Sequence, residues 1–287
     1  MKPASFSYHR ARDVPGATRS LAELGDEAKV IAGGQSLVPM MNFRLARPRH
    51  LVDVGGLREL RYLRTADDGL HIGALTTHHD VETAPESVTG PGFAVLREGM
   101  RWLGHLPIRT RGTIGGSLAH GDATAEWGLL TVLLDARVVA ENSAGRRRVI
   151  PAGELFLGFF TTTLDHDELI VEVIFPHRAP HAAITEFARR HGDFATVAAA
   201  VSLEMSDGEV HSGRIVLGGV AEVPRRSAAA EAALAEGGPA GPELFERCAE
   251  AAAEAIDPPS DANGSADYRR ALTRELVTAA CAKAASR

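Results

Sequence analysis

The chain has 287 residues, of which 45% are hydrophobic and 24% are charged, and its formal net charge is -6. This is the composition of a globular protein, and the length predicts about two domains whose core needs neither disulfides nor a structural metal. With only two cysteines, Cys248 and Cys281, the chain cannot by itself form a disulfide scaffold, a four-cysteine zinc site or an iron–sulfur cluster. The acidic balance argues against nucleic acid as the main partner.

The N-terminal segment does not resemble a secretory signal, because no apolar run follows Lys2. The most apolar stretch, residues 127–134, is far shorter than the ~20 residues that a bilayer requires. We therefore expect a soluble, cytoplasmic protein with no membrane span.

The first region, residues 1–54, is predicted to form a compact α/β unit. Apolar patterning predicts a helix at 17–24 and a buried strand at 29–32 that ends at a pair of glycines. Ser36 is a candidate N-cap for the short helical turn that follows, and a second strand is expected at 50–54.

The second region, residues 55–177, mixes strands and helices. Its patterns predict a strand at 70–74, helices at 77–82, 93–102 and 125–134, a hairpin of 137–141 with 146–150, and a strand at 169–175. The helix at 125–134 is apolar on most sides, which predicts that it is buried. The glycine-rich segment 109–117 is predicted to be non-helical.

The third region, residues 178–287, follows a breaker stretch that contains Pro176 and Pro180. Two β-type runs are joined through Asp207-Gly208, a good hairpin signal. Three alanine-rich helices complete the prediction, at 227–235, 242–256 and 266–284, the last with Ser265 as its N-cap.

Two glycine pairs carry the functional signal: Ala32-Gly33-Gly34-Gln35-Ser36 and Thr113-Ile114-Gly115-Gly116-Ser117. Each follows β-branched residues and ends in a short polar side chain. A glycine pair leaves backbone N–H groups uncovered, and successive N–H groups form an anion-binding concavity. A single glycine turn usually exists only because the backbone needs its conformation. Two such turns with matching polar endings favour a site that binds a pyrophosphate from both sides. Lys29, retained in an arginine-rich chain, suggests a compact positive charge beside the first pair.

Other signatures are missing from the sequence. It contains no G-x-G-x-x-G, P-loop, H-E-x-x-H or G-x-S-x-G motif and no nucleophile–base–orienter set. We therefore expect no catalytic residue of its own and no metal site. His78-His79-Asp80 and His166-Asp167 are interpreted as surface polar residues, since adjacent side chains diverge and no third ligand follows. For His120 two interpretations stay open, an approach to a cofactor and a structural hydrogen bond.

The segments 32–37 and 111–120 resemble the two FAD-pyrophosphate motifs of the flavin subunit of molybdenum hydroxylases, the carbon monoxide dehydrogenase and xanthine dehydrogenase family. The segments 190–195 and 265–270 resemble that family's C-terminal domain. The resemblance implies an α+β fold: a two-part FAD-binding domain of the vanillyl-alcohol-oxidase or PCMH-like type, then a smaller domain with a three-stranded sheet and helices. It divides the chain at residues 1–54, 55–177 and 178–287.

The same resemblance implies non-covalent FAD and a set of contacts with it. By motif position these contacts are Lys29, Ala32, Gly33, Gly34, Gln35, Ser36, Leu37, Ile108, Gly112, Thr113, Gly115, Gly116, Ser117, Glu126 and Leu169. Leu169 is where relatives cover the flavin ring with an apolar residue. Three positions depart from the family pattern. Ser117 stands where asparagine is frequent, Glu126 stands where relatives often have aspartate, and Phe194 stands at a position that can be tyrosine.

The function implied is that of an oxidoreductase subunit that transfers electrons. A small subunit would carry [2Fe-2S] clusters and a large subunit the molybdenum cofactor, in a dimer of heterotrimers, and electrons would leave FAD to an external acceptor. Two alternatives remain: a self-sufficient FAD-dependent oxidoreductase of the vanillyl-alcohol-oxidase-like fold, and a binding protein that has lost its flavin. FAD content and turnover by the chain alone discriminate among the three.

Overall fold

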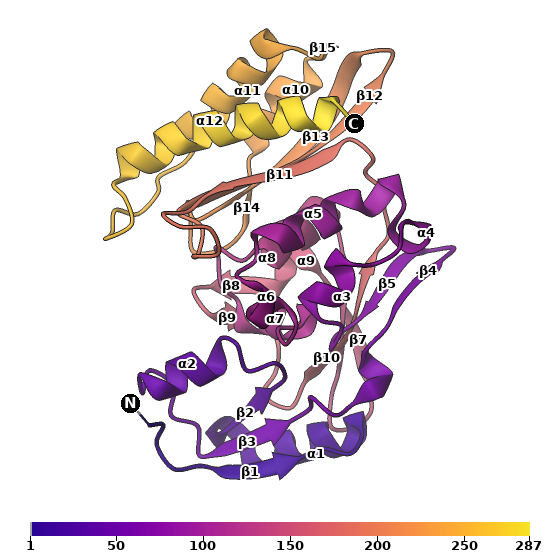
Figure 1. Ribbon diagram of the computed structural model, residues 1–287, viewed down its shortest axis with the longest axis vertical. Helices are drawn as coiled ribbons and strands as arrows, with labels where there is room; N and C mark the ends of the chain where they lie inside the picture. Colours follow the sequence, from indigo (N-terminus) through magenta and orange to yellow (C-terminus); the bar gives the residue numbers. More distant parts are fainter. Residues whose placement is uncertain (1) are drawn as a thin grey trace.

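The computed structural model describes residues 2–287. Its N-terminal unit forms one end of an elongated molecule and its alanine-rich helices form the other (Figure 1). The N-terminal unit is a parallel three-stranded sheet of order β1-β3-β2 with two helices: β1 (Ser7–Arg10), α1 (Val14–Leu24), β2 (Ala28–Ile31), α2 (Leu37–Asn42) and β3 (His50–Asp53). The expected α/β unit is present, with β1 as an additional edge strand. Asp13 caps α1 by accepting a hydrogen bond from the N–H of Gly16.

A five-stranded antiparallel sheet forms the middle of the molecule, in the order β4-β5-β10-β6-β7. Its strands are β4 (Leu63–Ala66), β5 (Gly69–Gly73), β6 (Arg137–Glu141), β7 (Arg147–Pro151) and β10 (Leu169–Phe175). The helices beside it are α3 (His78–Glu82), α4 (Glu86–Thr89), α5 (Ala94–Trp102), α6 (Leu106–Arg109), α7 (Ile114–His120), α8 (Glu126–Leu133) and α9 (Ala152–Leu155), with a small hairpin of β8 (Phe156–Gly158) and β9 (Thr161–Thr162).

The glycine-rich segment 109–117 corrects our prediction, because it contains the end of α6 and the start of α7. Thr113 caps α7, its hydroxyl accepting from the N–H of Gly116 at 3.1 Å. Packing overrides the low helix propensity of glycine here, since a Cβ on Gly115 would lie 2.7 Å from the Cβ of Ala74. The glycines of the second motif therefore let α7 sit against β5 and the turn that follows it.

The C-terminal domain is a sheet of three long strands, β11 (Ala182–Phe187), β12 (Val197–Ser206) and β13 (Glu209–Gly218), covered by α10 (Ala228–Ala235), α11 (Pro242–Glu254) and α12 (Ala266–Ala285). Two two-residue strands, β14 (Arg225–Arg226) and β15 (Gly238–Pro239), also pair with β13. The expected three strands therefore carry the sheet, and β14 and β15 extend it. Asp207 and Gly208 both have positive φ, which confirms the hairpin between β12 and β13.

Residues 197–203 of strand β12 are buried on both faces of the sheet, which explains why the sequence of this part is almost continuously apolar. Ala198 and Ala200 belong to the core that contains α5 and α8, whereas Val197, Ala199 and Val201 belong to the core under α10, α11 and α12. The C-terminal sheet is thereby joined to the middle of the molecule by shared hydrophobic packing. Cys248 and Cys281 are buried in the outer of these two cores. No helix within residues 2–287 is long and apolar enough to cross a membrane.

Candidate functional site

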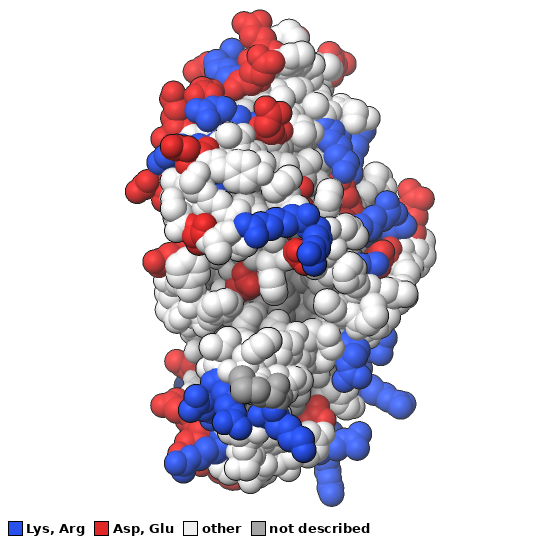
Figure 2. Space-filling model, turned by 60° about the vertical axis from the view of Figure 1, so that its left-hand side comes forward, with Lys and Arg blue, Asp and Glu red and all other residues white. Residues whose placement is uncertain are grey.

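A cavity of about 830 Å³ lies between the N-terminal unit, the middle sheet with its helices and the loop that precedes β12. Ligand sites typically measure about 300–1,000 Å³, so this cavity has the room for a large cofactor. Figure 2 shows the molecule hollowed on this face, with arginine and lysine side chains gathered below the hollow. All fifteen residues that the resemblance implied line this one cavity: Lys29, Ala32, Gly33, Gly34, Gln35, Ser36, Leu37, Ile108, Gly112, Thr113, Gly115, Gly116, Ser117, Glu126 and Leu169.

The first glycine motif presents a row of free donors to the cavity. Within residues 2–287, the backbone N–H groups of residues 33–37 donate no hydrogen bond. Ser36 precedes α2 as expected but does not cap it, because its side chain makes no bond to the helix and its backbone is helical. Gly34 has a φ of +72°, a conformation that suits glycine. Free N–H groups in succession, with Lys29 beside them, fit the two negative phosphates of a dinucleotide.

The second motif works differently, and here the structure departs from our expectation of two equivalent turns. The N–H groups of Gly115, Gly116 and Ser117 are used inside the fold, donating to Ala74 and to Thr113. The glycines of the second motif instead allow neighbouring segments of the chain to pack closely against it. Gly116 faces the first motif, since a Cβ built on it would lie 3.8 Å from the Cβ of Ala32.

The two motifs meet directly at Gly33. A Cβ on Gly33 would lie 2.6 Å from the carbonyl carbon of Arg111 and 2.9 Å from the nitrogen of Gly112, both of them backbone atoms. No real Cβ atom approaches backbone so closely, so only glycine allows this contact. The residue therefore sets the spacing between the two walls of the cavity.

Two carboxyl groups interact near the cavity: Glu126 is half-buried and lines it, whereas Glu186 is buried outside the lining. Glu126 begins α8, and Glu186 lies in β11 of the C-terminal domain. Burial raises the pKa of Glu126 to about 8, with the nearby charge of Glu186 as the second cause. Burial also raises the pKa of Glu186 to about 7. Oε2 of Glu186 has no hydrogen-bond partner. The carboxyl group at position 126 therefore lies near enough to a second acid for the charge of that acid to affect its pKa.

His78 corrects our interpretation of the His78-His79-Asp80 segment. It is 4% exposed, lines the cavity and accepts a hydrogen bond at Nδ1 from the indole N–H of Trp127, at 2.9 Å. Burial lowers its pKa to about 3, so it is neutral. His79 is a half-exposed surface residue as expected. The sequence signal that was missed is Trp127, whose indole N–H needs a partner inside an apolar helix.

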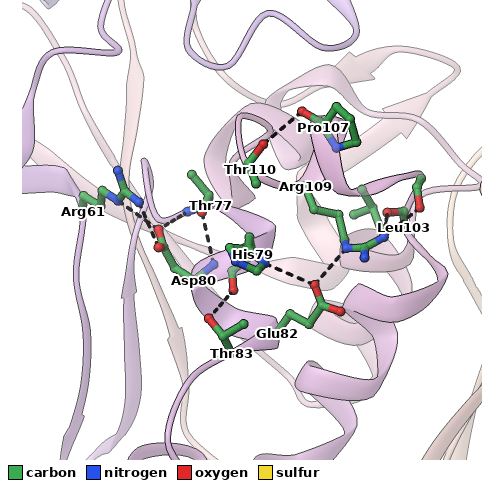
Figure 3. A network of polar contacts seen from close by, with 11 residues as sticks. Arg61, Thr77, His79, Asp80, Glu82, Thr83, Leu103, Pro107, Arg109 and Thr110 are labelled. Atoms are coloured by element: carbon green, nitrogen blue, oxygen red, sulfur yellow. Dashed lines mark hydrogen bonds and ion pairs between the residues drawn. The ribbon is translucent and has the colours of Figure 1, made fainter.

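A polar network holds α3 and α6 together beside the cavity (Figure 3). Thr77 and Asp80 form a reciprocal capping box at the start of α3, and Arg61 binds both carboxylate oxygens of Asp80 at 2.9 Å. Glu82 at the end of α3 accepts from Nε of Arg109 at 2.8 Å, and that guanidinium also donates to the carbonyl of Gly104. The segment that carries Ile108 and Gly112 is therefore anchored from behind.

Two aromatic residues outside the fifteen also line the cavity: Phe160, which no motif indicated, and Phe194, which the resemblance had singled out. Phe160 stacks against His120 with ring centroids 4.9 Å apart, and Phe194, 74% exposed, lies on the loop that leads into β12. Burial lowers the pKa of His120. His120 lines the cavity, and the two interpretations given above both stay open.

Comparison with known proteins agrees with this geometry. Residues 4–178 match the model of the FAD binding domain in molybdopterin dehydrogenase, and residues 182–284 match that of the CO dehydrogenase flavoprotein C-terminal domain. The fold and the cavity thus define a flavoprotein with an FAD-binding domain. The chain belongs to the family of FAD-binding medium subunits of molybdenum hydroxylases.

Relatives resemble the chain over its whole length. It is 41% identical to the 6-hydroxypseudooxynicotine dehydrogenase complex subunit alpha of Paenarthrobacter nicotinovorans, covering 100% of this chain and 97% of the relative. It is 37% identical to the nicotine 6-hydroxylase medium subunit of the same organism, with 100% of both chains covered. Its fold matches a chain of the carbon monoxide dehydrogenase of Hydrogenophaga pseudoflava that lacks the Mo-pyranopterin moiety of its cofactor, with a TM-score of 0.94, 36% identity and coverage of 100% and 99%.

Proposed function

We propose that the fifteen lining residues named above hold FAD non-covalently in the cavity. The observation that carries this proposal is the row of five N–H groups without partners at residues 33–37, facing the second motif across one cavity. When bound, the flavin supplies the redox chemistry. The chain itself positions the cofactor: the first motif donates to its phosphates, Leu169 gives an apolar surface for the ring, and the loop with Phe194 limits access.

We further propose that the chain works as an electron-transferring subunit of a cytoplasmic dimer of heterotrimers. A small subunit with [2Fe-2S] clusters would deliver electrons, a large molybdenum subunit would oxidise the substrate, and an external acceptor would receive the electrons. The names of the relatives support this, since they describe a complex subunit and a medium subunit.

The division of the chain into residues 1–54, 55–177 and 178–287 is part of the same proposal. The three hydrophobic cores support it in part, since one core gathers the N-terminal unit and another the outer helices. The family models also meet between residues 178 and 182.

Expression of the chain alone tests the proposal. We expect the purified protein to show a flavin absorption spectrum, or to gain one when FAD is added, and to release unmodified FAD on denaturation. Well-folded protein that binds no FAD under either condition would overturn it. Turnover of a substrate by the isolated chain would instead favour the self-sufficient oxidoreductase.

A further inference from the structure

The side chain of His78 has one nitrogen whose role the fold does not explain. Nδ1 accepts the hydrogen bond from Trp127, and the indole nitrogen is a donor only. A neutral imidazole that accepts at Nδ1 carries its proton on Nε2. Within residues 2–287, the ring of His78 makes no hydrogen bond besides the one at Nδ1. Nε2 is not among the side-chain atoms that are enclosed without a partner, so it keeps access to the space beside it although the residue as a whole is 4% exposed.

The surroundings of His78 point this donor toward the cavity. His78 lines the cavity together with Gly112 and Ile108. A Cβ built on Gly112 would lie 2.5 Å from Nε2 of His78 and 2.7 Å from its Cδ2. The edge of the ring with Nε2 therefore packs closely against Gly112. Any side chain at position 112 would clash with this edge and displace the ring.

Backbone and side-chain contacts fix the position of the ring. The N–H of His78 donates to the carbonyl of Gly112 at 3.1 Å, and the capping box of Thr77 and Asp80 holds the first turn of α3. Trp127 is fully buried on α8. The ring therefore has little freedom to turn its donor elsewhere, which is the preorganisation that a binding site requires.

We propose that His78 is a cofactor-binding residue: its Nε2–H, set in that tautomer by Trp127, donates a hydrogen bond to an acceptor atom of the bound FAD. This rests on the proposed function, because it needs FAD in the cavity. Trp127 is then a positioning residue that acts through His78. The neutral ring supplies a directed donor without a charge, whereas Lys29 supplies the charge.

Matched substitutions of His78 distinguish the role of Nδ1 from the role of Nε2. His78→Asn keeps an acceptor within reach of Trp127 but removes the donor at Nε2, and we expect FAD to bind about tenfold more weakly, the value of one hydrogen bond. His78→Gln keeps a donor at the reach of Nε2 and should bind FAD within about threefold of the wild type. His79→Asn is the control, since His79 is half-exposed and lies outside the cavity lining. Equal FAD affinity in wild type and His78→Asn would overturn the proposal.

A spectroscopic measurement keeps the proposal testable if the variants fold poorly. In protein labelled with ¹⁵N-histidine, two-bond ¹⁵N–¹H correlations identify the protonated nitrogen of His78. We expect Nε2–H in the absence of FAD, a shift of that signal when FAD binds, and partial loss of the tautomer preference in Trp127→Phe. A proton on Nδ1, or an Nε2–H signal that FAD does not move, would contradict the proposal. Wild-type protein that binds no FAD at all would contradict the proposed function instead.

ADP and riboflavin used as separate probes locate the acceptor. Weaker binding of ADP to His78→Asn places it on the nucleotide half of FAD, and weaker binding of riboflavin places it on the flavin half. If His78→Asn binds both probes and FAD as the wild type does, His78 serves only Trp127, and the proposal is wrong.

Discussion

At the scale of single residues, Gly33 shows how one missing side chain sets the shape of the site. Its Cα faces the backbone of Arg111 and Gly112, so a methyl group there meets atoms that cannot rotate away. The glycine pair was recognisable in the sequence, but its partner across the cavity was not. We therefore expect the smallest possible substitution to damage the cavity.

Gly33→Ala should lower the melting temperature and weaken FAD binding strongly. Overpacking costs about 1–3 kcal/mol, and each kcal/mol corresponds to roughly 2–4 °C in a protein of this size. The matched control is Gly153→Ala, because a Cβ on Gly153 meets nothing within 4 Å. Thermal unfolding and FAD titration measure both effects. If the two variants behave alike, the contact between the motifs does not control the site.

A substitution of Phe194 tests whether the loop that carries it limits access to the cavity. It lines the cavity but is 74% exposed, so a hydroxyl added to its ring stays in water and leaves the fold intact. Phe194→Tyr should therefore keep FAD bound and change the rate at which reduced flavin is reoxidised. Stopped-flow reoxidation with oxygen and with a quinone measures this rate. Unchanged rates with both acceptors would show that this loop does not limit access.

At the scale of elements, sequence patterns located most helices and strands but missed those that depend on neighbours. β11 contains two alanines and a glutamate, residues with weak strand preference, and it forms because it pairs along its whole length with β12. Helix α7 begins in a glycine-rich segment because Ala74 and Thr113 hold it. Local propensity alone does not indicate either element.

Arg269 on α12 joins that helix to the loop that borders the cavity. Its buried guanidinium donates to the carbonyls of Thr196 and Gly219 and to the carboxylate of Asp261. Arg269→Met would leave two carbonyls without a donor, at about 1–3 kcal/mol each. We expect a lower melting temperature and weaker FAD retention, because Thr196 follows the loop of Phe194 closely in the chain.

The control for Arg269→Met is Arg274→Met on the same helix. Arg274 pairs with Glu250 at the surface, and such pairs contribute little to stability. Calorimetry of both variants, with flavin content after gel filtration, measures the difference. Equal melting temperatures would mean that Arg269 is replaceable and that α12 does not support the cavity loop.

At the scale of the whole molecule, Glu126 and Glu186 make the stability of the flavin-free protein depend on pH. Both carboxyl groups have a pKa of 4.5 when exposed, and folding raises it to about 8 and about 7. The folded state therefore binds more protons than the unfolded state, and stability falls as pH rises through this range. His78, with its lowered pKa, acts in the opposite direction only below its ordinary value of 6.5.

Melting temperatures between pH 7 and pH 9, compared between the wild type and Glu186→Gln, test the carboxyl pair above the ordinary pKa of His78. We expect the melting temperature of flavin-free protein to fall across this interval, and to fall less in Glu186→Gln, which removes one of the two charges. Glu209→Gln, on the exposed start of β13, is the control and should follow the wild type. A wild-type melting temperature that rises from pH 7 to pH 9 would contradict the pKa values.

The sequence by itself determined the family and the cofactor, because glycine pairs and their polar endings are local features that a comparison of motifs recognises. The resemblance also named fifteen of the residues that line the cavity. Local signals predicted the alanine-rich helices and the hairpins of β6 with β7 and of β12 with β13, but not those of β4 with β5 and of β8 with β9. Only the tertiary structure decided that the two glycine motifs play unequal parts, that Glu126 is paired with Glu186, and that His78 is buried against Trp127. The groups in the last two of these properties are 60 and 49 residues apart, and no local pattern records which distant side chains come together in the fold.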